Sequence, residues 1–496
     1  MIKSCIRKIS LTSSLAVVAL RLTNTASGLL LSSPAASTLR QNKRFMLANS
    51  NSGDGDSTSS TTASSSTHKE IIDLQSHTLR RSPAETLLCL SEACQTLGVN
   101  SFDVYGDYQS SPEESFLRRF ESEVAGCFEK DDAVFCLSGG MAQSIALVIH
   151  SRSHASASNI DGSNFTLSFA CHPTSHLLLH EHDAYSELLG IEAALIVAGN
   201  KDFDIEDFKQ NGSFGLDPMR FSHVRHELLT DASLTTHPNQ KTITCNDVST
   251  LILELPHREI GGKLTPWDDV LRIAELCEKR KIKFHCDGAR IFEASAGYGH
   301  ETLAQTAKPF DSVYISFYKG LGAISGAMLL GDSDFVAEAR VWLRRFGGNL
   351  YSQLPYAVSA WAGFRESNLI MSNKSLRAEF LFDSNASFVK RQQKLARVIA
   401  SLNADSDVSS IVQFDPAIPE TNMIHGYFKH SFIDCKKALD NVEQNTGIRV
   451  LNRLREINHD STFGCRFEWT MGTANLSIDD KYFLIGWQEL SRALRS

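Results

Sequence analysis

Short apolar segments alternate with longer amphipathic segments over most of the chain beyond residue 70. Strands buried on both faces of a parallel sheet give continuous apolar runs, whereas amphipathic helices repeat their apolar positions every three to four residues. Residues 266–281 show the helical repeat, with Pro266 in the expected first turn. A second helical pattern covers residues 141–150, and strand-like runs occupy 133–137, 250–255, 281–286 and 312–317. The alternation predicts a large α/β domain with a mainly parallel sheet sandwiched by helices.

Composition divides the chain into four parts. Residues 49–67 are almost entirely small and polar, and they cannot bury enough apolar surface to offset chain entropy, so we expect a disordered Ser/Thr-rich linker there. Towards the C-terminus the pattern becomes less regular and ends in a strand-like stretch at 466–470, which predicts a smaller α+β domain. The predicted parts are a targeting segment, the linker, the large domain and the small C-terminal domain, at residues 1–48, 49–69, 70–371 and 372–496.

The N-terminal segment is basic. Residues 1–53 contain seven Lys or Arg and no Asp or Glu, and basic residues recur as far as Arg44. An organelle transit peptide and a secretory signal both fit such a start. The recurring basic residues favour the transit peptide, and therefore a mitochondrial or plastid location. The alternatives are the secretory pathway, or a cytoplasmic protein with a disordered basic tail.

The rest of the chain is acidic, since its 42 Lys and Arg against 57 Asp and Glu give a formal net charge of −15. This charge argues against a nucleic-acid partner, which usually requires a basic surface. No apolar run reaches the roughly 18 residues of a membrane span, so we expect no membrane association. The eleven Cys are scattered without a C-x-x-C pair or zinc-finger spacing, which predicts reduced thiols and no metal site.

Candidate chemistry lies where predicted strands meet loops, at the edge of an α/β sheet that binds ligands. Ser138-Gly139-Gly140 opens a helix, so its backbone N–H groups suit a phosphate, although a plain strand–helix turn fits equally well. Asp287 follows a strand, where a carboxylate can cap a helix, bind a metal or hold a cationic ring nitrogen. Arg290 can bind a substrate carboxylate or only a surface acid.

Lys319 follows another predicted strand and precedes Gly320 and Gly322. A Lys in this place either extends to solvent or serves as an amine whose pKa is lowered by burial. It lies 32 residues after Asp287, enough for one helical crossover between adjacent parallel strands. Pyridoxal phosphate requires this combination of a Lys, an acid and a phosphate-binding helix start. The glycines follow the Lys and do not open a helix, so we reject a dinucleotide site.

Six ordered motifs resemble those of the threonine aldolase and aromatic amino acid β-eliminating lyase family. HCDGARIFEA is similar to the family's D-G-A-R segment, and SFYKGLGAISGAMLLG to its S-x-S-K-G-L-G-A-P segment. Four further segments resemble family motifs in the same order. The motif D-L-R-S-D-T-V-T-x-P is matched by IDLQSHTLRRSP, and D-D-V-Y-G-E by FDVYGDY. The motif S-G-T-M-x-N is matched by FCLSGGMAQSIAL, and E-N-T-H-N-x-x-G-G by LELPHREIGGKLTP. The resemblance covers roughly residues 70–365 and, more weakly, the C-terminal part.

The resemblance implies a fold-type-I architecture, pyridoxal phosphate as cofactor, a small amino-acid substrate, and a homodimer or homotetramer with shared active sites. Lys319 matches the Schiff-base lysine, Asp287 the acid on the pyridine nitrogen, and His176 the His stacked on the cofactor ring. The other matches are to the phosphate loop (Ser138, Gly139, Gly140) and to groups that hold the substrate carboxylate (Ser76, Arg290, Arg466), with Arg290 also within reach of the cofactor.

The chain departs from the family motifs at several positions. Gly140 replaces a Thr whose hydroxyl would help to hold the phosphate, which predicts weaker cofactor affinity and tighter binding in Gly140→Thr. Tyr318 replaces the Ser before the lysine, and Ile324 replaces a Pro. Asp183 and Ala184 fall near the family's Gly-Gly. We expect the family's second His to come from the loop that contains His223, His226 and His237.

The expected reaction is the cleavage of a β-hydroxy amino acid, threonine or allo-threonine, to glycine and an aldehyde. Lys319, His176 and Asp287 are the predicted catalytic residues, with His176 either taking the hydroxyl proton or serving only for stacking. The alternatives are β-elimination or transamination on the same scaffold, and a non-catalytic homologue. The presence of both Lys319 and Asp287 argues against a non-catalytic homologue.

Overall fold

The computed structural model describes residues 71–78, 81–106, 111–157, 167–196, 224, 234–235, 247–365, 387–457 and 462–495. The predicted targeting segment and linker lie outside these residues, and so do His223, His226 and His237. None of the described helices combines the length and the apolarity that a bilayer crossing requires.

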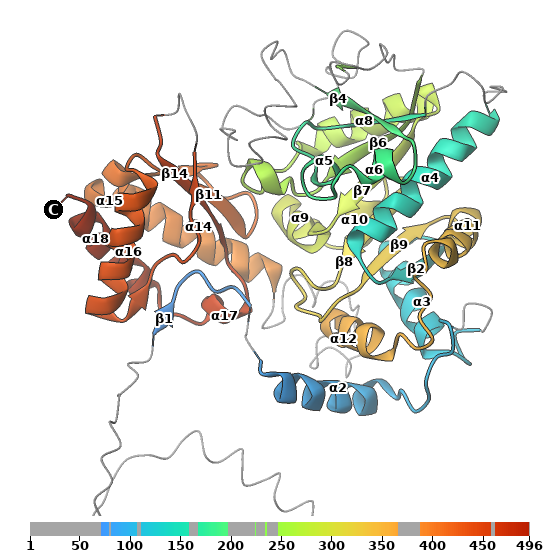
Figure 1. The fold of residues 1–496 in the computed structure, drawn as a ribbon, viewed down its shortest axis with the longest axis horizontal. Coiled ribbons are helices and arrows are strands. Elements are labelled where there is room, and N and C mark those ends of the chain that lie inside the picture. Colours follow the sequence, from blue (N-terminus) through green and yellow to red (C-terminus); the bar gives the residue numbers. More distant parts are fainter. Residues whose placement is uncertain are drawn as a thin grey trace, which may run out of the picture. The chain divides into compact units, whose positions relative to one another are not determined.

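A mainly parallel sheet organises the large domain (Figure 1). Five strands that are neighbours in the sheet run parallel, in the spatial order β8, β7, β6, β3 and β4. The strand β9 is antiparallel to both of its neighbours, β8 and β2, and β5 is antiparallel to β4. The four predicted strands of this domain are confirmed as β2, β6, β7 and β8. Across the sheet the described strands are β2 (Asp132–Cys136), β9 (Ala327–Gly331), β8 (Ser312–Ser316), β7 (Lys283–Gly288), β6 (Val248–Glu254), β3 (Ser168–Cys171), β4 (Glu192–Ile196) and β5 (Leu234–Thr235).

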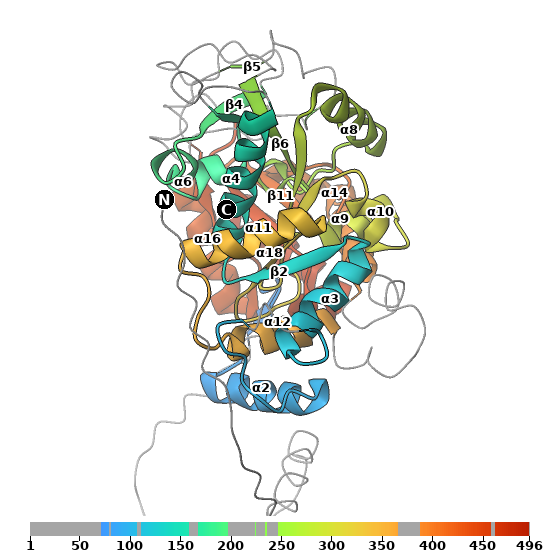
Figure 2. The same cartoon turned by 90° about the vertical axis from the view of Figure 1, so that its right-hand side faces the viewer.

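Helices cover both faces of this sheet, which is why its strands are apolar throughout. Alternate residues of one strand pack on opposite faces: Phe135 of β2 joins one core cluster, and Val134 joins another. The Phe135 face is covered by α2 (Pro83–Leu97), α3 (Phe116–Phe128), α8 (Trp267–Arg280), α9 (Ile291–Tyr298), α10 (Leu303–Ala307) and α12 (Leu354–Arg365). The Val134 face is covered by α4 (Gly139–Ala157) and α11 (Ser333–Arg345), side by side in Figure 2, and by the short helices α5 (His176–Leu179) and α6 (Ala184–Glu187).

The crossover between β7 and β8 places Asp287 near the end of β7 and Lys319 just after the neighbouring parallel strand β8, as their spacing predicts. Two short helices, α9 and α10, make this crossover instead of the single helix that we expected. Thr302 caps the start of α10 with a reciprocal pair of hydrogen bonds. Its hydroxyl accepts from the Gln305 backbone N–H, and the Gln305 side-chain oxygen accepts from the Thr302 backbone N–H.

The C-terminal domain is built on an antiparallel sheet with the strand order β10-β11-β14-β13. The predicted strand at 466–470 is confirmed as part of β14. The first described strand, β1 (Ile72–Asp73), pairs with β12 (Ile448–Arg449), and Leu74 belongs to this domain's core. The other elements are β10 (Val412–Asp415), β11 (Met423–Phe428), β13 (Arg455–Glu456), β14 (Cys465–Thr470), α14 (Phe388–Ala404), α15 (Ser406–Ile411), α16 (Phe432–Thr446), α17 (Thr473–Leu476) and α18 (Asp480–Arg495).

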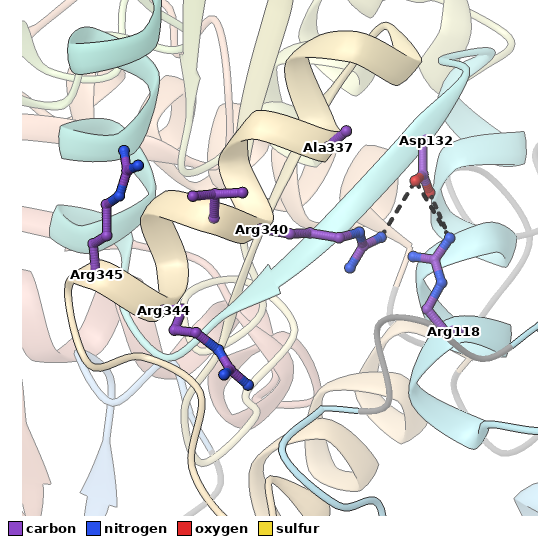
Figure 3. A pocket seen from close by; sticks show the side chains of 7 residues that line it. Arg118, Asp132, Ala337, Arg340, Arg344 and Arg345 are labelled. Carbon is purple, nitrogen blue, oxygen red and sulfur yellow. Dashed lines mark hydrogen bonds and ion pairs between the residues drawn. The ribbon is translucent and has the colours of Figure 1, made fainter. Parts of the chain in front are cut away.

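The outer edge of β2 is covered by a charged cluster (Figure 3). Glu121 of α3, 1% exposed, accepts a hydrogen bond from the Phe135 N–H at 2.8 Å, and Arg340 of α11 donates to the Ala133 carbonyl at 2.6 Å. Arg118 and Arg340 both pair with Glu121 and with Asp132. Arg118, Asp132 and Arg340 of this cluster line a cavity of about 600 Å³, and none of the residues that line it is a predicted site residue. The hydrogen bonds of the cluster to the Phe135 N–H and the Ala133 carbonyl satisfy backbone groups that could otherwise pair with another strand.

Candidate active site

The carboxyl ends of adjacent strands bring the candidate residues together. Lys319 follows β8, Asp287 lies near the end of β7, Glu254 ends β6, and His176 follows β3 after a short loop. The register places Glu254 directly beside Asp287. β2 and β8 are both antiparallel to β9, so they point in the same direction, and the helix start at Gly139 belongs to the same edge. The expected clustering of Lys, acid and helix start is therefore present.

Asp287 is buried and held by two hydrogen bonds. Its Oδ2 accepts from Gln143 Nε2 at 2.8 Å, and its Oδ1 accepts from the Ala289 N–H at 3.1 Å. Burial raises the pKa of Asp287 to about 6, with help from the Glu254 carboxylate, while His176 and the two hydrogen bonds oppose the shift. A carboxyl group with this pKa becomes ionised when a cation binds beside it, as a protonated ring nitrogen would.

Lys319 is half-buried at the start of a loop. Burial lowers the pKa of its ammonium group, Arg290 and Arg258 lower it further, and Asp287 and Glu468 oppose the shift. A larger share of the amine is therefore neutral near pH 7, which is the form that attacks an aldehyde.

Tyr318 shows what the replacement of the family's Ser adds. The Lys319 Nζ lies 5.2 Å from the centre of the Tyr318 ring. Burial raises the pKa of Tyr314, and a hydrogen bond with Tyr318 raises it further. The Tyr314 phenol therefore stays protonated beside the phosphate loop.

The two glycines of the predicted phosphate loop are required by close approach. A Cβ atom on Gly139 would lie 2.0 Å from the Tyr314 hydroxyl oxygen, and one on Gly140 would lie 2.5 Å from Glu181 Oε2. Ser138 caps α4, because its hydroxyl accepts from the Met141 N–H at 3.3 Å. The first two residues of this 19-residue helix therefore carry no side chain, and their backbone N–H groups are the donors that a phosphate would use.

Glu181 also explains the Gly that replaces the family's Thr. Its Oε1 accepts a hydrogen bond from His176 Nε2 at 2.8 Å, while its Oε2 fills the place of a side chain at position 140. Burial lowers the pKa of His176, but the bond to Glu181 and the charges of Asp287 and Glu254 outweigh burial and raise it. A larger share of His176 is therefore charged near neutral pH than of an unperturbed imidazole.

The three residues matched to a substrate carboxylate occupy different settings. Arg290 is half-buried at the start of α9, within electrostatic range of Lys319. The Ser76 N–H donates to Asp73 Oδ1 at 2.9 Å, and its hydroxyl donates to the Thr78 carbonyl at 3.4 Å. Arg466 is buried in β14, with Nη2 3.8 Å from Glu259 Oε2. The geometry connects Arg290 to Lys319, and all three roles stay predictions.

The structure adds His257 and an ion pair to the predicted set. His257 follows β6, is buried, and occupies the His position of the E-N-T-H-N motif, so the segment quoted above already contained its signal. Arg258 stands where that motif has Asn, and its Nε lies 2.8 Å from Glu468 Oε2. Burial raises the pKa of Glu468, but Arg258 and Arg290 outweigh it and hold the pKa at about 2. No sequence pattern pointed to Glu468, which reaches the edge from the C-terminal sheet.

These residues fit the requirements of pyridoxal phosphate. The edge offers a lysine with a lowered pKa, a buried carboxylate that a cation would ionise, and a helix start without side chains. Lys319 would hold the aldehyde carbon, Asp287 the ring nitrogen, and the backbone at Gly139 and Gly140 the phosphate.

Comparison with known proteins supports the same conclusion. The sequence pattern described as "Beta-eliminating lyase" matches residues 103–414. A crystal structure of a candidate L-allo-threonine aldolase from Listeria monocytogenes is 30% identical, with a TM-score of 0.62, and the match covers 85% of this chain and 96% of that one. Low-specificity L-threonine aldolase 1 of Arabidopsis thaliana is 24% identical over 394 residues, 78% of this chain and 91% of the relative.

A more distant structure shows the fold alone. The ornithine aminotransferase of Toxoplasma gondii, with pyridoxal phosphate partly occupying its active site, is 12% identical, with a TM-score of 0.50, over 83% of this chain and 82% of that one. The fold is thus that of the fold-type-I pyridoxal-phosphate enzymes, which confirms the predicted fold class. Within that class, the chain belongs to the beta-eliminating lyase family, as its motifs indicate. The prediction of an enzyme of the lyase class is therefore confirmed.

Proposed function

We propose that this enzyme uses pyridoxal phosphate to cleave a β-hydroxy amino acid, L-threonine or L-allo-threonine, to glycine and an aldehyde. The observation that carries the proposal is the convergence of Lys319, Asp287 and two imidazole groups, His176 and His257, on one sheet edge. The names of the Listeria and Arabidopsis relatives, both of which specify an L-threonine or L-allo-threonine aldolase, support the substrate class.

Each residue has a defined task in this proposal. Lys319 would hold the aldehyde carbon of the cofactor, and Asp287 would face the ring nitrogen and keep it protonated. Arg290 binds the substrate carboxylate. The cofactor, when bound, supplies an electron sink for the pair left on the substrate's Cα.

The β-hydroxyl proton needs an acceptor. His176 is less suited, because its bond to Glu181 raises its pKa and so increases the share of imidazolium, which has no lone pair to offer. Its bond to Glu181 suits a positively charged ring that stacks. His257, at the end of the neighbouring strand β6, is the better base. We therefore assign stacking to His176 and proton acceptance to His257.

β-Elimination is the second candidate reaction. It begins with removal of the Cα proton, and the lowered pKa of Lys319 gives this enzyme an amine that can do so. Aldol cleavage differs because it breaks Cα–Cβ and needs a base at the β-hydroxyl.

Product analysis separates the two reactions. The purified enzyme with added cofactor is incubated with L-threonine, L-allo-threonine and L-serine, and the products are identified by mass spectrometry. We expect glycine and acetaldehyde from at least one threonine isomer. Ammonia and a 2-oxo acid without glycine would contradict the proposal and establish elimination.

We also propose a homo-oligomer and an organelle location. Large apolar side chains are exposed along α2 and the segment that follows it, including Leu87 (67%), Leu88 (63%) and Phe102 (72%). A second copy of the chain is the occupant expected for such a surface in this family, and its active sites would be shared. The basic N-terminal segment supports the organelle.

A further inference from the structure

Three buried side chains form a hydrogen-bonded chain beside the candidate active site. His172 and Thr174 lie in the loop after β3, and His257 follows β6, the neighbouring strand. Their exposed fractions are 5%, 2% and 4%. The Thr174 hydroxyl oxygen lies 2.9 Å from His172 Nδ1 and 2.7 Å from His257 Nε2. The two rings meet edge to face, with centroids 4.5 Å apart.

The position of one proton follows from a backbone contact. The Thr174 N–H donates to His172 Nδ1 at 3.1 Å, and a backbone amide can only donate. His172 Nδ1 must therefore carry a lone pair, and the ring proton of a neutral His172 sits on Nε2. Because Nδ1 cannot donate, the Thr174 hydroxyl is the donor in its own contact with that nitrogen.

The next proton is then fixed as well. A hydroxyl has a single hydrogen, and the Thr174 hydroxyl donates it to His172 Nδ1. The Thr174 oxygen can therefore only accept in its contact with His257. His257 Nε2 must carry the proton in the 2.7 Å contact. In a neutral His257 the lone pair is consequently on Nδ1.

The charged surroundings of His257 agree with this assignment. Glu254 Oε2 lies 4.0 Å from His257 Nε2 and favours a proton on that nitrogen. Glu254 itself stands in register with Asp287 on β7, which links the imidazole to the acid assigned to the cofactor ring. The Thr174 hydroxyl, in the loop after β3, and the Glu254 carboxylate, at the end of β6, thus both favour a proton on His257 Nε2.

We propose that Thr174 and His172 are positioning residues that hold His257 in the Nε2–H form, so that its Nδ1 takes the proton of the substrate's β-hydroxyl. This inference rests on the proposed aldol cleavage. In that step the O–H proton moves to Nδ1 and the oxygen electron pair forms the aldehyde carbonyl. The Cα–Cβ bond breaks, and its electron pair stays on Cα. Without the Thr174 hydroxyl, His257 is free to turn or to exchange its protonated nitrogen.

The test compares the holoenzyme with Thr174→Val, which removes the hydroxyl and keeps the shape, and with Thr174→Ser, which keeps the hydroxyl. For Thr174→Val we expect kcat for glycine formation to fall by about tenfold or more, as a share of the ~10²–10⁴ that a positioned base contributes. KM and the cofactor absorbance should stay close to wild type, and Thr174→Ser should restore most of kcat. An unchanged kcat in Thr174→Val, or a loss that Thr174→Ser fails to restore, overturns the proposal.

A second measurement does not depend on turnover. In ¹⁵N-histidine-labelled wild-type enzyme near neutral pH, the His257 signals, identified by their loss in His257→Gln, should show a protonated Nε2 and an unprotonated Nδ1. A protonated Nδ1 overturns the proposal even if the enzyme is an aldolase. If the Nε2–H form is found but no substrate yields glycine, the aldol function fails instead, and the two failures are distinguished.

Discussion

Asp287 is the residue whose protonation most directly controls the site. Because its pKa is about 6 before the cofactor binds, it carries a proton in a growing share of molecules as the pH falls below 6. A protonated acid cannot pair with a pyridinium, so we predict that the affinity for pyridoxal phosphate falls on acidification below about pH 6. Fluorescence titration of the cofactor at several pH values measures this dependence, and a flat profile from pH 5 to 8 would contradict it.

Replacing this acid should separate binding from turnover. Asp287→Asn keeps the size and the oxygen that accepts from the Ala289 N–H, but it replaces the oxygen that accepts from Gln143 Nε2 and removes the negative charge beside the ring nitrogen. With the cofactor at saturating concentration we expect the site to stay occupied, although the cofactor is held more weakly, and the rate to drop at least ~100-fold, since breaking a buried charge pair costs several kcal/mol. Asp131→Asn, at the exposed residue that precedes β2, is the matched control. Near-normal turnover of Asp287→Asn would remove Asp287 from the mechanism.

Position 140 shows how the structure changes an expectation drawn from motifs alone. The missing Thr hydroxyl suggested that Gly140→Thr would tighten cofactor binding. A side chain there would collide with the Glu181 carboxylate, with a Cβ 2.5 Å from Oε2 and 2.9 Å from Cδ, and would break the bond to His176. We now predict that Gly140→Thr weakens cofactor binding, as measured by equilibrium dialysis. Gly126→Ala, where a Cβ meets no atom within 4 Å, should leave it unchanged. Tighter cofactor binding in Gly140→Thr would contradict this prediction, because it would show that the Glu181 carboxylate moves aside at little cost.

At the scale of elements, the edge strand β2 depends on one buried carboxylate. Removing Glu121 leaves Arg118 and Arg340 without their buried partner and the Phe135 N–H without its acceptor. We expect Glu121→Ala to lower the free energy of unfolding by about 3–5 kcal/mol, the usual result of breaking a buried ion pair. Arg345→Gln, in the same cavity but exposed over the Trp342 ring, should cost at most about 1 kcal/mol. Denaturant unfolding of both variants measures the difference, and similar small losses would contradict the account.

The elements that could be predicted are those whose pattern is local. Continuous apolar runs identified β2, β6, β7 and β8, and the spacing of Asp287 and Lys319 placed them on neighbouring strands. The antiparallel β9 between β8 and β2 and the two-helix crossover were not predicted, because neither leaves a distinct period in the sequence. Glu468 is missed for a related reason. It reaches the site only because the C-terminal sheet is brought against Arg258, and no local pattern encodes that contact.

On the scale of the whole molecule, the apolar surface of α2 is the feature that assembly should cover. The double substitution Leu87→Glu with Leu88→Glu places two charges on this surface, so we expect it to dissociate the oligomer, as read by analytical ultracentrifugation. If the active sites are shared between subunits, the double variant should also lose activity as the oligomer dissociates. Ile433→Glu, at an equally exposed position on α16, is the control and should leave the assembly intact. A wild-type monomer, or a double variant that sediments like wild type, would contradict the proposed interface.

The covalent attachment of the cofactor tests the central claim most directly. Borohydride reduction of the holoenzyme fixes a Schiff base as a stable secondary amine, and peptide mapping by mass spectrometry then locates it. We predict a single pyridoxyl group on Lys319, because this lysine combines a lowered pKa with a position at the sheet edge beside Asp287. A pyridoxyl group on another lysine, or none after reduction of cofactor-saturated enzyme, would contradict the account.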